Sequence, residues 1–246
     1  MASPDTPKYR LNPSPRISAN QLAEYTLASP SRRQSILRNA KFAPTFLVIR
    51  YSEAKKAICD YLADDSRPIA KLLEIENAQT VKSQGGGSAF KKNDAMLSAE
   101  AIKEFRKVLN GNKLPKTLVF EKPKGNFPKL DIGGVDISIS LDLIAKNNGN
   151  GGVGGVLIQT SKAIAAKSWR EDHSRSVASL VWMLSAQCLA DVGKVDRKYC
   201  FSIDLFGQSV TSAPLTYKRR LNDIEASCSE ISALWDSISP PSDYVD

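Results

Sequence analysis

The sequence lacks the parts of several common functional sites. Its four cysteines show no Cys-x-x-Cys spacing, and His173 is the only histidine. A closed Cys/His zinc site and a histidine-based catalytic triad therefore have no basis here. No apolar run approaches the roughly 18 residues that a membrane span requires, and the first thirty residues contain no hydrophobic block. We expect a cytoplasmic protein with reduced cysteines and no membrane contact.

Positive charge is unevenly distributed along the chain. The 246 residues carry a formal net charge of +8. Residues 1–56 contain ten Lys and Arg against three acids, whereas the other 190 residues contain 24 against 23. A localised basic region is typical of proteins that bind a phosphate-rich partner, because each neutralised phosphate releases counterions. The alternative is a solvated face that keeps the protein soluble.

The first third of the chain predicts a basic helical region. Residues 1–17 are rich in Pro, Ser and charge, which is typical of a flexible basic arm. Residues 18–82 then read as helices: Ser18 and Gln21 form a capping box, and Ser29-Pro30 opens a second helix. Two short helices of which the second is basic resemble a helix-turn-helix. The predicted nucleic-acid-binding residues are Arg32, Arg33, Arg38 and Lys41, together with Lys218, Arg219 and Arg220 at the start of the last helix.

A glycine-rich stretch, SQGGGS, occupies residues 83–88, after the predicted helical region. We expect residues 83–97 to be a linker between two halves. A phosphate-binding loop is the alternative interpretation, but no strand precedes the glycines and no Gly-Lys-Ser/Thr follows them.

The second half predicts an α/β domain over residues 98–246, so the fold class is α+β. Val135 to Leu143 alternate apolar and polar residues, as a strand with one buried face does. We expect the order αβββαβα and a mixed four- to five-stranded sheet flanked by helices. The expected helices begin near 98, 174 and 217, and the expected strands cover 116–122, 135–143, 153–162 and 199–206.

The order helix, three strands, helix, strand resembles the core of the PD-(D/E)XK, or restriction-endonuclease-like, superfamily. That resemblance implies an acid near the second strand and an acid-x-Lys on the third, which bind Mg²⁺ and activate water for phosphodiester hydrolysis. Asp142 and Lys162 match two of these positions and are the candidate catalytic residues, with Asp142 as the metal ligand. Thr160 stands where the pattern requires the second acid, so the motif is degenerate.

A second resemblance covers most of the chain. The segments ISANQLAEYTLASPSRRQSILRNAKF, YCFSIDLFGQSVTSAP and YKRRLNDIEASCSEISALW look like an uncharacterised bacterial family associated with mobile elements and phage defence. This resemblance implies a role in a mobile-element or phage-defence system, but it implies no mechanism.

These observations lead to three hypotheses. The first is a cytoplasmic protein of a bacterial defence or mobile-element system that binds DNA or RNA and has a degenerate nuclease-like domain. The second is an active nuclease that requires Mg²⁺. The third is a non-catalytic interaction subunit of a larger ribonucleoprotein or defence complex, with protein subunits as partners.

Overall fold

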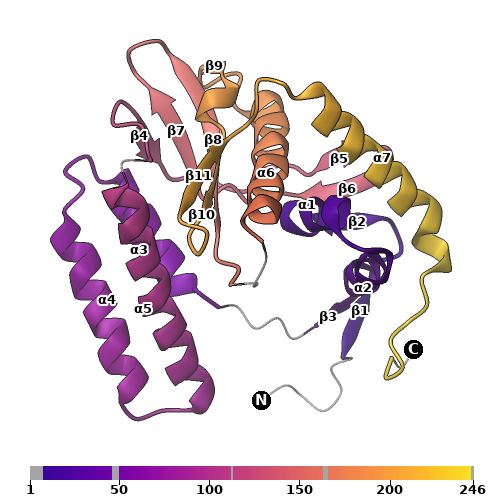
Figure 1. Cartoon of the computed structure of the whole chain (residues 1–246), viewed down its shortest axis with the longest axis horizontal. Coiled ribbons are helices and arrows are strands. Elements are labelled where there is room, and N and C mark those ends of the chain that lie inside the picture. Colours follow the sequence, from indigo (N-terminus) through magenta and orange to yellow (C-terminus); the bar gives the residue numbers. More distant parts are fainter. Residues whose placement is uncertain (1–7, 46–49, 112, 163–165, 245–246) are drawn as a thin grey trace. The chain divides into compact units, whose positions relative to one another are not determined.

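The computed structural model describes residues 8–45, 50–111, 113–162 and 166–244 (Figure 1). The chain divides into two compact units, each assembled from separate segments. The terminal unit comprises Met1–Val48, Pro128–Ile139 and Thr216–Asp246, and the central unit comprises Ile49–Phe127 and Ser140–Leu215. Helices and mixed sheets together confirm the expected α+β class. No helix in the described ranges is long and apolar enough to cross a membrane.

Among its described residues, the terminal unit contains three α-helices and two small sheets. Strand β6 is central to a three-stranded sheet, where it pairs in parallel with β2 and antiparallel with β5. Strands β1 and β3 form a separate antiparallel pair. The helices are α1 (Ala19–Leu27), α2 (Pro30–Lys41) and α7 (Lys218–Leu234), and the strands are β1 (Tyr9–Leu11), β2 (Arg16–Ser18), β3 (Phe42–Pro44), β5 (Leu130–Ile132) and β6 (Val135–Ser138).

The caps that the sequence predicts for this unit are present. Ser18 and Gln21 form the capping box of α1, and Pro30 is the first residue of α2. The side chain of Trp235 is fully buried, and its indole nitrogen donates to the carbonyl of Asn12 at 3.2 Å. The two ends of the chain therefore fold into one core.

The central unit contains a mixed sheet with the strand order β11-β10-β8-β7-β4. Strand β8 pairs antiparallel with β7, in parallel with β10 and, at its start, with the short β9. The strands are β4 (Val119–Glu121), β7 (Leu143–Asn147), β8 (Gly152–Gln159), β9 (Lys194–Val195), β10 (Phe201–Asp204) and β11 (Ser209–Ser212). The helices are α3 (Ser52–Ala63), α4 (Ile69–Gln84), α5 (Ala89–Asn110) and α6 (Lys167–Cys188).

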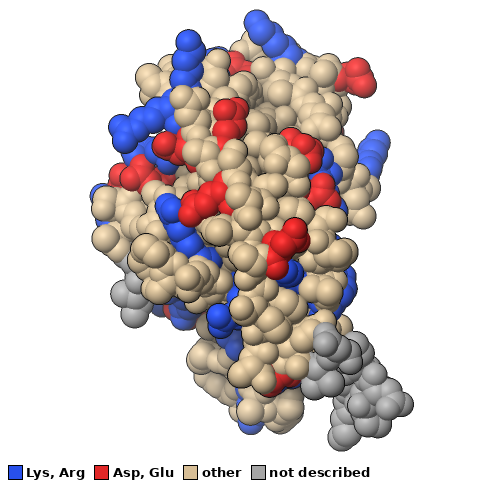
Figure 2. All heavy atoms as spheres, turned by 90° about the vertical axis from the view of Figure 1, so that its right-hand side faces the viewer, with Lys and Arg blue, Asp and Glu red and all other residues tan. Residues whose placement is uncertain are grey.

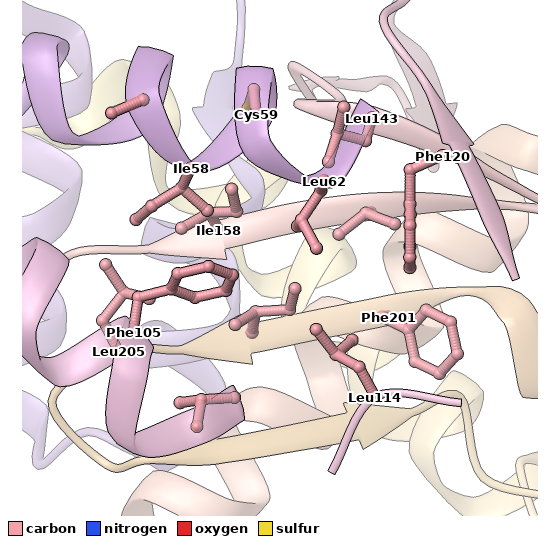
Figure 3. Packing of buried hydrophobic residues seen from close by; sticks show 14 of the residues in the cluster. Ile58, Cys59, Leu62, Phe105, Leu114, Phe120, Leu143, Ile158, Phe201 and Leu205 are labelled. Carbon is pink, nitrogen blue, oxygen red and sulfur yellow. The ribbon is translucent and has the colours of Figure 1, made fainter. Parts of the chain in front are cut away.

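Helices cover both faces of this sheet, so β8 is buried along its whole length. On one face Val156 and Ile158 join a core with α3 and α5, which contribute Ile58, Leu62 and Phe105 (Figure 3). On the other face α6 packs against β8 and β10 through its buried apolar side chains. Burial on both faces explains why β8 reads as a nearly continuous apolar run.

The chain leaves no room for a side chain at Gly154 in β8. A Cβ atom there would lie 2.4 Å from the backbone of Tyr199, which is closer than any real contact. The glycine is therefore required by close approach of the backbone of a neighbouring segment.

The strand expected over 135–143 is wrong as a single element. Val135–Ser138 is β6 of the terminal unit, whereas Leu143–Asn147 is β7 of the central unit. The side chains of Val135, Ile137, Ile139, Leu141 and Leu143 are nevertheless all buried. Alternation predicts which side chains are buried, but it carries no information about the sheet in which each half of the segment pairs.

The expected linker over 83–97 is also wrong for most of its length. Helix α4 continues to Gln84 and α5 begins at Ala89, because Ser88 caps α5 at a point well before Ser98. Residues 1–17, expected as a flexible arm, include strand β1 and the first residues of β2, and residues 1–7 lie outside the described residues. The expected boundary at 17 lies within the terminal unit, where the two chain ends pack together, and those at 82 and 97 lie within the central unit, where α4 packs against α5.

Candidate nucleic-acid interface and sheet edge

Polar residues gather where β7 begins and where β8 and β10 end. Asp142 directly precedes β7, and Gln159 is the last residue of β8. Gln159 lies opposite Asp204, the last residue of β10, in the parallel register. Because β7 runs antiparallel to β8, all three residues lie at the same edge of the sheet. This is the edge at which the sequence predicts a nuclease-like site.

Both carboxylate oxygens of Asp142 are occupied by groups of the chain itself. Oδ1 lies 2.9 Å from Nζ of Lys55 on α3, and Oδ2 accepts the backbone N–H of Ile158 at 2.6 Å. The backbone N–H of Asp142 donates in turn to the carbonyl of Val156 at 2.8 Å. Asp142 thus fixes the start of β7 against β8, and Lys55 neutralises its charge.

Lys162 follows β8 and also has an internal partner. Its ammonium group forms an ion pair with Glu100 on α5 and lies 5.3 Å from the ring centre of Phe206. The ring of Tyr51 meets Phe206 edge-on, with the ring centres 6.0 Å apart. Burial raises the pKa of the Tyr51 hydroxyl above its ordinary value.

Asp204 and Gln159 form a buried polar network under helix α6. The side chain of Asp204 is 4% exposed and binds Arg170 through two hydrogen bonds, Nε to Oδ2 at 2.8 Å and Nη2 to Oδ1 at 2.5 Å. The N–H of Gly207 donates to Oδ1 at 3.0 Å. Gln159 donates to the hydroxyl of Ser202, and Ser174 on α6 lies 3.4 Å from the same nitrogen. A charge buried this deeply requires such a partner.

The edge does not present the donor set that a divalent cation needs. Across the described ranges, no three His, Cys, Asp or Glu side chains lie close enough to share a metal ion. Lys55, Lys162 and Arg170 instead neutralise Asp142, Glu100 and Asp204, respectively. A Mg²⁺ ion at this edge has to displace an ammonium or guanidinium group, and a hard cation usually takes six or more oxygen ligands. No catalytic step through a metal follows from these residues.

The basic residues of α2 are largely engaged within the terminal unit. Arg32 binds Glu24 at 2.7 Å, and this hydrogen bond raises the pKa of Arg32. Arg33 contacts Glu230 at 3.1 Å and donates to the carbonyl of Tyr25. These pairs tie α2 to α1 and α7.

Lys41 and Arg38 differ in their surroundings. Nζ of Lys41 donates to the carbonyls of Trp235, Asp236 and Ile238 and so caps the end of α7 and the turn after it. Arg38 is exposed, has no side-chain partner among the described residues, and lines a hollow of about 230 Å³ beside the end of α7.

The basic cluster of the last helix occupies its first turn. Helix α7 begins at Lys218, so positive charge lies at the helix end where the dipole disfavours it. Lys218 and Arg219 are exposed and contact no acceptor among the described residues, whereas Arg220 has an interaction within the chain.

Folding redistributes the charge that the sequence concentrates near the amino end. The segments of the terminal unit contain 11 Lys and Arg against 10 Asp and Glu, a net charge of +1, because Thr216–Asp246 carries six acids. The central unit contains 23 against 16, a net charge of +7. The face of the molecule in Figure 2 accordingly shows basic and acidic side chains interspersed. Residues 1–56, which carry most of the excess positive charge in the sequence, are divided between the two units.

Many cations of the central unit have no internal partner. Their side chains contact no carboxylate, other acceptor or aromatic ring among the described residues, and most are exposed. They are Arg50, Lys82, Lys91, Lys92, Lys103, Lys116, Lys124, Lys167 and Lys194.

Sequence reasoning missed the partners at the sheet edge. Lys55 lies 87 positions before Asp142, and no local pattern links them. For Asp204, an acid within an apolar strand signals that a partner is needed if the strand is buried, but it does not identify Arg170.

Comparison with known proteins assigns no family to the chain. No protein-family model matches it, and no curated protein is found to be similar to it.

Proposed function

We propose that this protein binds nucleic acid and that its central unit provides most of the phosphate contacts. The observation that carries the proposal is the net charge of +7 on that unit, together with its set of cations without internal partners. Lys and Arg side chains that are free of carboxylates can approach phosphates without first breaking an ion pair. Each such contact releases condensed counterions and so contributes to affinity.

We infer that the nuclease-like sheet edge is not catalytic. The central unit has three sheet strands between α5 and α6, followed by β10, which is the element order that suggested the PD-(D/E)XK superfamily. The neutralised carboxylates at the edge support a structural role, because each ion pair holds a helix to the sheet. In this account Asp142 and Lys162, the candidate catalytic residues of the sequence analysis, instead hold α3 and α5 to the sheet.

The terminal unit has a smaller part in this proposal. Arg32, Arg33 and Lys41 stabilise the unit, whereas Arg38, Lys218 and Arg219 are free to contact phosphate or an acidic protein. We propose that this nucleic-acid binding serves a cytoplasmic system that acts on mobile or foreign DNA.

The proposal is tested with two matched quadruple variants of the full chain. One replaces Lys103, Lys116, Lys124 and Lys167 with alanine, and the other replaces Arg10, Arg38, Lys218 and Arg219. All eight are exposed and have no side-chain partner among the described residues, and both variants lose four positive charges. Binding to labelled duplex DNA, single-stranded DNA and RNA is measured by fluorescence anisotropy. We expect the larger loss of affinity in the central variant; equal losses overturn the assignment to the central unit.

A cleavage assay tests the non-catalytic part. Plasmid and single-stranded DNA are incubated with excess protein and Mg²⁺ or Mn²⁺, and we expect no cleavage. Cleavage by the wild type that is lost in both Asp142→Asn and Lys162→Met, with folding confirmed by circular dichroism, establishes the nuclease alternative instead.

A further inference from the structure

Helices α4 and α5 form an antiparallel hairpin whose turn is rich in glycine (Figure 1). The N–H of Gly85 closes the last turn of α4 on the carbonyl of Val81 at 3.0 Å, and the hydroxyl of Ser88 accepts the N–H of Lys91 at the start of α5. Gly87 has a φ of 138°, which favours glycine. Cβ atoms built at Gly86 and Gly87 meet nothing within 4 Å. The turn is therefore well defined, and no side chain shields its backbone.

Phe90 is exposed in the first turn of α5. Of the Phe, Tyr and Trp side chains that the structure describes, it alone is exposed, at 48%. Val81, in the last turn of α4, is 67% exposed. The other described aromatic residues are at least partly buried. Phe90 and Val81 thus expose apolar surface on both sides of the glycine turn, where a ligand can reach it.

Three lysines without ionic partners belong to the helix ends that flank the same turn. Lys91 and Lys92 follow Phe90 directly, and Lys82 lies in the last turn of α4. None of the three contacts a carboxylate among the described residues. The nearest acid in the sequence, Asp94, accepts the backbone N–H of Tyr51 at 3.1 Å. An apolar ring is thus combined with unneutralised positive charge.

We propose that this tip, comprising Val81, Lys82, Phe90, Lys91 and Lys92, binds single-stranded nucleic acid. Phe90 stacks on an unpaired base, and the lysines contact the phosphates on either side of it. The choice of ligand rests on the proposed function. A duplex keeps its bases stacked on one another, so only a single strand offers a base face to Phe90. The glycine turn carries no side chains, so a nucleic-acid strand can approach the protein backbone closely there.

The experiment compares the full-length wild type with variants at Phe90, using a labelled 20-nucleotide oligo(dT) and a duplex of the same length. Stacking on an aromatic ring contributes about 1–3 kcal/mol per base, so Phe90→Ala weakens oligo(dT) binding roughly 5- to 150-fold. Phe90→Trp retains the affinity, and Phe90→Leu, which keeps an apolar side chain but no ring, loses it. Duplex binding changes less than twofold in all three variants.

The lysines are tested with a matched control on the same helix. Lys91→Ala/Lys92→Ala reduces the slope of log affinity against log salt by about 0.7 for each phosphate that is no longer neutralised. Lys107→Ala removes a lysine of the same helix that is already paired with Glu104 at 2.6 Å and lies about 24 Å along α5 from Lys91, at 1.5 Å per residue, so it leaves oligo(dT) binding nearly unchanged. Met96 is 50% exposed, and Met96→Ala serves as the apolar control.

The outcomes separate this inference from the proposed function. If the wild type binds nucleic acid and Phe90→Ala binds oligo(dT) equally well, the tip is not the site, although the proposed function stands. If Phe90→Leu retains full affinity, a general apolar contact replaces stacking and the inference is overturned. If the wild type binds neither DNA nor RNA, both proposals fail, and the tip becomes a candidate for a protein partner.

Discussion

The Arg170–Asp204 pair offers the sharpest test of how the sheet edge is stabilised. In Arg170→Met the Asp204 carboxylate, whose side chain is 4% exposed, loses its only cationic partner among the described residues. Removing one member of a buried ion pair typically costs about 3–5 kcal/mol, because a buried charge is left uncompensated. Adding Asp204→Asn removes that charge and keeps an oxygen for the N–H of Gly207, so the double variant regains about half of the loss.

The assay is urea unfolding monitored by circular dichroism at 222 nm. Arg175→Met is the control, because Arg175 lies on the same helix but pairs with Glu171 and Asp172 at the surface, where its side chain is 45% exposed. Surface pairs contribute less than about 1 kcal/mol. The reasoning is refuted if Arg170→Met loses no more stability than Arg175→Met, or if Asp204→Asn fails to restore any stability to Arg170→Met.

Three further predictions concern packing, capping and thiol reactivity. Gly154→Ala places a Cβ 2.4 Å from the Tyr199 backbone and destabilises the protein by about 1–3 kcal/mol in thermal unfolding, whereas Gly86→Ala, in open space, is nearly neutral. Lys41→Met removes the cation that binds three carbonyls and lowers the free energy of unfolding by about 1.5–3 kcal/mol, while Arg38→Met leaves it unchanged. Burial raises the pKa of Cys59 and Cys228 to about 12 and that of Cys200 to about 11, so iodoacetamide at pH 8 modifies the less buried Cys188 first. Rapid modification of Cys59 in the folded protein contradicts the prediction that Cys188 reacts first.

Local sequence patterns predict that α1, α2, α6 and α7 exist, although α6 begins at Lys167, ahead of the expected start near 174. The capping box at Ser18, the Ser29-Pro30 start and the apolar stripes of α6 and α7 all depend on neighbours within a few positions. The start of α5 is missed because Ser98 resembles an N-cap in the sequence, whereas Ser88 caps the helix and Ser98 is buried within it.

Long-range partners could not be predicted from one sequence. Asp142 pairs with Lys55, and Lys162 pairs with Glu100, across separations that carry no periodic signal. The distribution of charge is misleading for the same reason. Residues 1–48 look strongly basic alone, but the fold places them in one unit with the acids Asp223, Glu225 and Glu230. Charge along the chain predicts a phosphate-binding surface only when neighbours in sequence are also neighbours in space.

The salt dependence of binding by the wild-type protein tests the central claim most directly. Affinity for single-stranded and duplex DNA is measured by anisotropy from about 50 to 300 mM KCl. If at least three free lysines contact phosphates, log affinity falls with log salt at a slope of about −2 or steeper on a single strand and about −2.7 or steeper on a duplex. A slope near zero on both ligands, or no binding at the lowest salt, contradicts the account.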